Sequence, residues 1–217
     1  MRSLLGWLGV LGGILSVEGR AQTNPGESHG RWAVGISRSV SSLSPGSVGP
    51  SEDGVEIAWA PDRPSLWGLA AGYGTRMRVS ITARFGKAGL GARGETSEET
   101  GASGRVLIVS EGVYDVLTVG VTFSRHVLRL RGGPALRSFL GAGIESWSAL
   151  GESPRTIAGL HGGLALEVAI VGPFLAALEG ELGFTPASPF KREEMPANYR
   201  LRSTWRRTLG GAIYWRF

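Results

Sequence analysis

The sequence predicts an all-β fold, namely an eight-stranded antiparallel up-and-down transmembrane β-barrel. Three observations predict it. The chain opens with a short apolar segment typical of export signals, and apolar residues then recur at every second position in eight segments. The alternate positions carry small residues and a few charges, which suits a barrel lumen better than a solvated surface.

The N-terminus is typical of a secretory signal peptide. Arg2 precedes an apolar stretch, Leu4 to Val17, that is too short to span a bilayer comfortably. Small residues at Gly19 and Ala21 fit the positions that a signal peptidase recognises. We predict cleavage after Ala21, which gives a signal peptide at 1–21 and a barrel domain at 22–217. An ordinary N-terminal helix is the alternative.

The composition fits a folded, exported protein without a nucleic-acid partner. The chain has 217 residues, of which 42% are hydrophobic, enough for one domain. It has no Cys, which excludes disulfides, cysteine metal sites and a lipoprotein anchor. Apart from Lys87 and Lys191, all basic residues are arginines, which suit buried ion pairs. They are scattered along the chain and form no nucleic-acid recognition motif.

Eight segments alternate in the manner of β-strands. They cover 31–40, 54–60, 65–86, 105–128, 135–149, 155–170, 174–184 and 202–217. Short connections at 61–64, 129–134 and 171–173 alternate with longer polar ones at 41–53, 87–104 and 187–201, and a short loop at 151–154 departs from this rule. We expect all 11 prolines to lie outside strand interiors, because proline cannot donate to a β-ladder.

The polar face decides between a soluble and a membrane barrel. A soluble barrel would expose a face rich in Lys and Glu, whereas this face is rich in Gly, Ala, Ser and Thr. Small residues suit the interior of an eight-stranded barrel, which is only wide enough for side chains. We therefore expect the apolar face to contact lipid. A soluble periplasmic ligand-binding barrel with ordinary surface charges is the alternative.

Eleven charged residues share the predicted lumen face, and their charges nearly balance. An unpaired buried charge is strongly unfavourable, so we expect these residues to form a paired network. The positive members are Arg76, Arg78, Arg84, Arg137, Arg206 and Arg216, and the negative members are Glu56, Glu145, Glu167, Glu179 and Glu181.

Most aromatic residues share the outward, apolar parity, and several lie near strand ends, where a membrane-interface girdle belongs. Those expected to face outward are Trp32, Trp59, Trp67, Tyr73, Phe85, Phe123, Phe174, Phe184, Trp205, Trp215 and Phe217. Four take the inward parity, namely Tyr114, Phe139, Trp147 and Tyr214.

The last segment, RSTWRRTLGGAIYWRF, ends in Phe217 and has apolar residues at alternate positions before it, namely Leu209, Ile213 and Trp215. It resembles the C-terminal strand of small bacterial outer-membrane β-barrels of the OmpA/OmpX type. The resemblance covers about residues 30–217 and is architectural. It implies that these four residues form the signal recognised by the barrel-assembly machinery. Arg207 departs from the pattern, because its parity is outward.

Ser124 and His126 raise the possibility of catalysis, because a Ser–His pair can perform acyl transfer. Some small outer-membrane barrels are lipid A deacylases, in which the Ser, His and Glu of the triad face lipid. Here His126, His161 and Glu145 have lumen parity, so we expect no catalytic site. We expect a structural hydrogen bond between His161 and Glu145 instead.

The loops carry weaker signals. The Gly-rich stretch at 86–104 lacks the pattern of a phosphate-binding loop, and we expect an outward loop. The acidic stretches at 97–99 and 192–194 are candidates for divalent ions that bridge lipopolysaccharide, with solvated loops as the alternative. His29 beside acidic residues does not make a metal site. We expect no metal and no cofactor.

The sequence thus predicts a bacterial outer-membrane barrel with a plugged lumen and a structural, adhesive or loop-presenting role. Its expected partners are outer-membrane lipid, lipopolysaccharide and the barrel-assembly machinery, and a monomer is expected. A lipid A-modifying enzyme of the same fold and a narrow passage for small apolar molecules are the alternatives.

Overall fold

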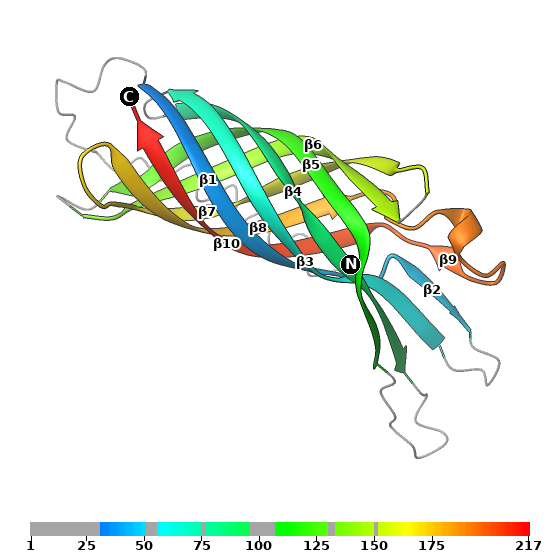
Figure 1. Ribbon diagram of the computed structural model, residues 1–217. Helices are drawn as coiled ribbons and strands as arrows, with labels where there is room; N and C mark the ends of the chain where they lie inside the picture. Colours follow the sequence, from blue (N-terminus) through cyan, green and yellow to red (C-terminus); the bar gives the residue numbers. More distant parts are fainter. Residues whose placement is uncertain (1–30, 51–55, 75–76, 96–106, 130–132, 150–151) are drawn as a thin grey trace.

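The computed structural model describes residues 31–50, 56–74, 77–95, 107–129, 133–149 and 152–217. Eight long strands in this part form a closed antiparallel ring (Figure 1). Each pairs with the next along the chain, and β1 pairs with both β3 and β10, which closes the barrel. The predicted up-and-down barrel is therefore confirmed. Its strands are β1 (Arg31–Leu43), β3 (Glu56–Gly74), β4 (Met77–Glu95), β5 (Leu107–Arg129), β6 (Ala135–Ala149), β7 (Arg155–Ala169), β8 (Phe174–Thr185) and β10 (Thr204–Arg216).

The two ends of the barrel differ. Short connections at 75–76, 130–134 and 170–173 join the strands at the end where the chain terminates, which we call the turn end. The opposite, loop end carries β2 (Ser47–Pro50), the short 3-10 helix η2 (Arg192–Glu194) and β9 (Arg200–Leu201) (Figure 1). β2 pairs with β3 and β9, so the sheet continues beyond the barrel there. No helix in the described residues is long and apolar enough to cross a membrane. The predicted signal peptide lies outside the described residues.

One predicted strand, 65–86, is wrong, because the structure divides it between β3 and β4. Tyr73 pairs with Val79, and both positions are odd. Outward residues on the two strands therefore keep the same parity, and the alternation passes through the connection without interruption. Gly74, at φ +143°, ends β3 in a conformation that favours glycine.

The predicted connection at 61–64 is also wrong, because β3 runs through it. Pro61 and Pro64 therefore lie inside a strand, against expectation. Pro61 directly precedes a register shift between Asp62 and Ser65, and Pro64 lies within it. On the other side of β3, pairing with β1 ends at Ser65 and pairing with β2 begins at Trp59. The prolines thus occupy a bulge on a locally unpaired edge, where a missing N–H donor costs little.

The bulge reverses the faces of β3 on its loop-end side. Trp59 was predicted to face outward, but it packs against the interior apolar cluster. Its partner on β4 is Ala92, which is buried. Glu56 was predicted to face the lumen, but it is exposed. The start of the outward loop expected at 86–104 is also wrong, since β4 continues to Glu95.

The outside of the barrel is apolar. In the described part of the chain, 32 large hydrophobic side chains are exposed, among them Ile81, Leu140, Leu160 and Leu209. Each would cost about 1.5–3 kcal/mol if left in water, so the total would be on the order of tens of kcal/mol. A closed barrel with an apolar outside and a polar inside is the architecture of bacterial outer-membrane barrels.

Aromatic pairs lie near both ends of this apolar surface. At the turn end, the ring centroids of Trp215 and Phe217 are 4.8 Å apart and those of Trp32 and Tyr73 are 5.1 Å apart. At the loop end, the Trp205 ring lies 4.8 Å from that of its neighbour Phe184. Such pairs fit the two girdles expected where a membrane barrel meets the headgroups.

Candidate functional site: the charged lumen

The lumen gathers most of the predicted charge network. Nine of the eleven residues contribute to ion pairs or hydrogen bonds inside the barrel. Of the other two, Glu56 is exposed at the loop end and Arg76 lies outside the described residues. The nine fall into two layers, which are centred on Glu167 near the turn end and on Glu181 farther into the barrel.

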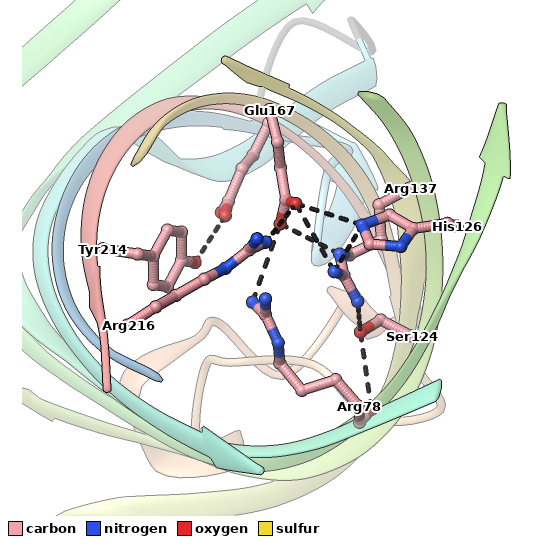
Figure 2. A network of polar contacts seen from close by, with 8 residues as sticks. Arg78, Ser124, His126, Arg137, Glu167, Tyr214 and Arg216 are labelled. Atoms are coloured by element: carbon pink, nitrogen blue, oxygen red, sulfur yellow. Dashed lines mark hydrogen bonds and ion pairs between the residues drawn. The ribbon is translucent and has the colours of Figure 1, made fainter. Parts of the chain in front are cut away.

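The Glu167 layer brings three arginines to one carboxylate (Figure 2). Arg137 donates from Nε to Glu167 Oε1 over 2.9 Å, and Arg216 donates from Nη2 to Oε2 over 2.9 Å. Arg78 Nη1 lies farther away, 3.6 Å from Oε1. These residues reach the same point because each stands close to the turn-end terminus of its strand on the inward face.

The chemistry of Arg137 fixes the protonation of His126. Arg137 Nη2 lies 2.7 Å from His126 Nε2. A guanidinium can only donate, so Nε2 must accept and carries no proton. The imidazole that accepts from Arg137 is neutral, and the same Nε2 lies 3.3 Å from Glu167 Oε2. Arg137 also donates from Nη1 to Ser124 Oγ over 3.1 Å.

Tyr214 connects the two layers. Its hydroxyl donates to Glu179 Oε1 over 2.7 Å, and the Arg78 guanidinium lies 5.8 Å from the centroid of its ring. Glu179 in turn lies 4.0 Å from Arg84, which belongs to the second layer. Figure 2 shows Tyr214 pointing across the lumen beside Arg216.

The Glu181 layer contains two arginines and three carboxylates when Glu179 is included. Arg84 Nη1 lies 2.8 Å from Glu181 Oε2, and Arg206 Nη2 lies 2.9 Å from Oε1. Arg206 also pairs with Glu145, which accepts a hydrogen bond of 3.3 Å from the Trp147 indole. Each arginine thus contacts two carboxylates, which offsets the large cost of burying its charge.

A small cavity adjoins the second layer. Its volume is about 30 Å³, and Arg84, His161 and Arg206 are among its lining residues. That volume suits one or two water molecules. His161 Nε2 lies 3.0 Å from Thr122 Oγ1, whereas the expected partner, Glu145, pairs with Arg206. The predicted His161–Glu145 hydrogen bond is therefore replaced by one to Thr122.

An apolar cluster occupies the loop end of the lumen. Its centre is Phe190, which is fully buried although it lies in the connection between β8 and β10. The Phe190 ring lies 6.1 Å from Tyr114, whose ring lies 6.4 Å from Trp147. The remaining buried members are Leu66, Ala88, Val116 and Ile157.

Polar contacts fix the loop that carries Phe190. Arg155 Nε donates to the Ser188 carbonyl oxygen over 2.7 Å. Lys191 Nζ lies 3.0 Å from Glu152 Oε2 and 3.7 Å from Glu194 Oε1. The hydrogen bond between them lowers the pKa of Glu152 and raises the pKa of Lys191. We call these three side chains, Glu152, Lys191 and Glu194, the loop latch.

The acidic stretch at 192–194 forms η2, and Glu194 accepts hydrogen bonds from the Tyr114 hydroxyl and the Lys191 amide. Its carboxylate is therefore occupied by contacts within the protein. The other acidic stretch, 97–99, and His29 lie outside the described residues. In the described part of the chain, no cluster of three or more His, Asp or Glu side chains is arranged to hold a metal ion.

Ser124 lacks the geometry of a nucleophile. Its hydroxyl donates to the carbonyl oxygen of Arg78 and accepts from Arg137. His126 Nε2, which would have to act as the base, is occupied by Arg137. The arrangement is that of a structural polar network, and it offers no activated hydroxyl for acyl transfer.

The four residues of the predicted C-terminal signal all point outward. Leu209, Ile213, Trp215 and Phe217 are between 47% and 63% exposed, and they alternate with inward-facing residues of β10. Arg207 is exposed too, as its parity predicted. On neighbouring β1, the guanidinium of outward-facing Arg38 lies 5.2 Å from the Trp67 ring centroid.

Sequence reasoning missed two residues that organise the lumen. Phe190 was assigned to a polar loop, and no periodic pattern marks it. Tyr214 was noted only as an aromatic residue of inward parity. Its inward parity was the available signal. Glu179 lies on the strand that pairs with β10, where it is opposite Gly210, and Tyr214 lies four residues farther along the same face and is opposite Leu175.

Comparisons with known proteins found similar solved structures but no related sequence. No family model matches the sequence, and no curated protein matches it. Among solved structures, the attachment invasion locus protein Ail of Yersinia pestis is 17% identical, covering 87% of this chain and 99% of that chain with a TM-score of 0.43. The outer membrane protein OprG from Pseudomonas aeruginosa is 11% identical, with coverages of 88% and 97% and a TM-score of 0.48. The outer membrane protein AlkL is 13% identical, with coverages of 92% and 96% and a TM-score of 0.48. The chain is similar to these barrels in fold.

Proposed function

We propose that the chain is a bacterial outer-membrane protein whose plugged barrel anchors and presents its long loops. The observation that carries this proposal is the succession of side chains along the lumen. The Glu167 layer, the Glu181 layer and the apolar cluster around Phe190 follow one another from the turn end to the loop end. An eight-stranded barrel leaves little room beyond its side chains, which favours a closed lumen.

The proposed orientation follows from the two ends. Outer-membrane barrels have short periplasmic turns and longer extracellular loops. The turn end, with the C-terminus, therefore faces the periplasm, and the end with β2, η2 and β9 faces outward.

Conductance in planar bilayers tests the plug. We expect no steady conductance from the wild type. Replacing Arg84, Arg206, Glu145 and Glu181 by serine removes two positive and two negative charges, so the net charge is kept while the middle layer is emptied. Combined with Phe190→Ala, which truncates the centre of the apolar cluster, this variant keeps only the Glu167 layer intact and should therefore conduct more than the wild type. A steady ion current through the wild type would refute the plugged lumen.

The arrangement of the outer loops supports a loop-presenting role. Arg155 and the loop latch fix the segment at 186–203, and β2 and β9 pair with one another beside it. The proposed adhesive role is tested on whole cells that display the protein. Replacing 44–55 and 186–203 by short Gly–Ser turns should abolish attachment while the barrel still shows heat-modifiable migration on gels. If cells with the replaced loops attached as well as the wild type, another part of the protein would be responsible for adhesion.

The proposed partners at the membrane are lipid, lipopolysaccharide and the assembly machinery. Arg38 and Arg207 lie on adjacent strands and face outward, where guanidinium groups can reach phosphate headgroups. The outward row that ends in Phe217 supports recognition during assembly. Phe217→Ser should slow insertion in cells, with Phe174→Ser, another exposed turn-end aromatic, as the matched control.

Two alternatives lack a supporting contact. A lipid A-modifying activity would need a free Ser–His pair, and Ser124 and His126 are both bonded to Arg137. A passage for small apolar molecules would need more room than a cavity of about 30 Å³. Hydrolysis of lipid A that is lost in His126→Ala, or uptake of apolar solutes into vesicles, would revive the respective alternative.

A further inference from the structure

The Glu167 layer carries more positive than negative charge. In the part of the chain that the structure describes, Glu167 is the only carboxylate paired with Arg78, Arg137 and Arg216. His126 is neutral, because its Nε2 accepts a hydrogen bond from Arg137. Three guanidinium groups thus face one carboxylate, an excess of two positive charges within this layer, while the surplus carboxylate of the other layer, Glu179, is bonded to Tyr214 and paired with Arg84.

The three arginines are not equally satisfied. Arg137 uses Nε, Nη1 and Nη2 for Glu167, Ser124 and His126. The Nε atoms of Arg78 and Arg216, in contrast, are buried without a hydrogen-bond partner. Arg78 reaches Glu167 only at 3.6 Å, and its side chain is 7% exposed. The Nε atoms of Arg84 and Arg206 in the Glu181 layer are buried without a partner as well, so it is the charge balance, and not the unused donors alone, that distinguishes the two layers.

Neither residue can relieve the imbalance by losing a proton, because arginine stays charged in proteins. A buried charge without a partner is strongly disfavoured in a barrel surrounded by lipid. A counter-ion can arrive from water, since the Arg216 side chain is 25% exposed and that of His126 is 20% exposed. Both stand near the turn end of the barrel.

We infer that the Glu167 layer is an anion site that binds a small oxyanion between Arg78 and Arg216. The ligand needs two or more oxygens at short spacing, because each guanidinium offers parallel donors in a planar fork. Inorganic phosphate and simple carboxylates share this chemistry. The inference concerns the barrel itself and holds whether or not the outer loops are adhesive.

The Glu181 layer supplies an internal contrast. There, Arg84 and Arg206 face Glu145, Glu179 and Glu181, so carboxylates outnumber guanidinium groups. That layer should repel anions although it holds the same residue types. Oxyanion binding is thus expected only near the turn end.

Thermal unfolding of the full refolded chain tests the site, with inorganic phosphate as the probe. The protein is held in a non-ionic sugar detergent without phosphate groups, and unfolding is followed by heat-modifiable migration and circular dichroism. We expect millimolar phosphate to raise the Tm above that in chloride at the same ionic strength. Calorimetric titration should give one site per chain. Acetate in place of phosphate distinguishes a carboxylate site from a phosphate site.

Three substitutions locate the site, one of them as a control. Arg216→Gln should weaken phosphate binding at least tenfold, whereas Arg207→Gln, which removes an outward arginine from the same strand, should leave it unchanged. Ser124→Asp places a fixed carboxylate beside Arg137 and the excess charge. It should raise the Tm in chloride and abolish the further increase with phosphate, as expected if the added carboxylate replaces the ion.

Three outcomes would overturn the inference. The first is an equal Tm in phosphate, acetate and chloride at matched ionic strength. The second is undiminished phosphate binding in Arg216→Gln. The third is a loss of the phosphate effect in Arg207→Gln that is as large as the loss in Arg216→Gln, which would place the ion on the outer surface. If Ser124→Asp fails to fold, the two arginine variants still decide the question.

Discussion

Arg137 Nε lies 2.9 Å from Glu167 Oε1, and both side chains are only 4% exposed. They stand on the neighbouring strands β6 and β7, near the turn end. The same carboxylate also pairs with Arg78 and Arg216, which makes Glu167 the common partner of three positive charges. Its negative charge is therefore the least replaceable one in the lumen.

Glu167→Gln should be strongly destabilising, because it leaves three buried guanidinium groups without a carboxylate. Breaking a buried ion pair from one side costs about 3–5 kcal/mol. We expect a loss of that size in urea unfolding from lipid vesicles, measured in buffer without phosphate so that no oxyanion takes the place of the carboxylate. Glu152→Gln, on the exposed loop latch, is the control and should unfold like the wild type. A loss below about 1 kcal/mol, as for a surface pair, would contradict the central role of Glu167.

Gly35→Ala should displace Tyr214. A Cβ on Gly35 would come 2.3 Å from Tyr214 Cδ1 and 2.9 Å from the Ile213 carbonyl oxygen, so the ring must move and its hydrogen bond to Glu179 is strained. Overpacking of this kind costs about 1–3 kcal/mol. Gly180→Ala is the matched control, since nothing lies within 4 Å of its Cβ position.

A double-mutant cycle tests the mechanism of the Gly35 effect. If the clash with the ring causes the loss, Gly35→Ala should cost much less in a Tyr214→Ala background than in the wild type. Equal costs in both backgrounds would assign the effect to the strand backbone and not to Tyr214.

The strand count and the lipid-facing surface could be predicted from alternation alone, but two strand boundaries could not. Tyr73 and Val79 pair with each other and both have odd residue numbers. The alternation of apolar residues therefore does not reveal where β3 ends and β4 begins. The bulge at Pro61 and Pro64 has the opposite effect, because it shifts the parity of Trp59 and Glu56 without interrupting the strand. Periodicity records the parity of a residue and not the pairing of the backbone, which depends on the neighbouring strands.

The members of the lumen network were predictable, but their partners were not. Inward parity places Arg84 and Glu181 on one surface, whereas their contact depends on strands separated by 97 positions in the sequence. The stagger of the barrel decides which side chains meet across it, and a single sequence does not encode that stagger locally. For the same reason Phe190 could not be foreseen, since its burial depends on how its connection folds back over the lumen.

Phe190→Ala should release the outer connection without unfolding the barrel. Truncation of a fully buried Phe removes about 3–5 kcal/mol, which here stabilises the segment at 186–203 against local opening. We expect faster amide hydrogen exchange in that segment and unchanged exchange in β6 and β7. Phe174→Ala, which removes a lipid-facing ring, should leave the exchange of 186–203 as it is. Faster exchange throughout the barrel would show that Phe190 stabilises the whole fold.

The loop latch should make the position of this connection depend on pH. The pKa of Glu152 is lowered by its hydrogen bond to Lys191, so its contribution is complete above the usual value of about 4.3 and is lost as the pH falls through the lowered pKa. The pKa of Lys191 is raised, so its contribution is complete below about 10.4 and is lost as the pH rises through the raised pKa. The latch should therefore hold from about pH 5 to pH 10 and open on either side.

Spin labels can measure this opening, because the chain has no Cys and labelling sites can be introduced without competition. With labels at Ser153→Cys and Ala197→Cys, we expect one narrow distance distribution at pH 7 and a broader one at pH 3. Lys191→Met removes the cation that Glu152 and Glu194 share, so the distribution should already be broad at pH 7 and should respond little to acid. A narrow distribution in Lys191→Met at pH 7 would mean that Arg155 and Phe190 hold the connection without the latch.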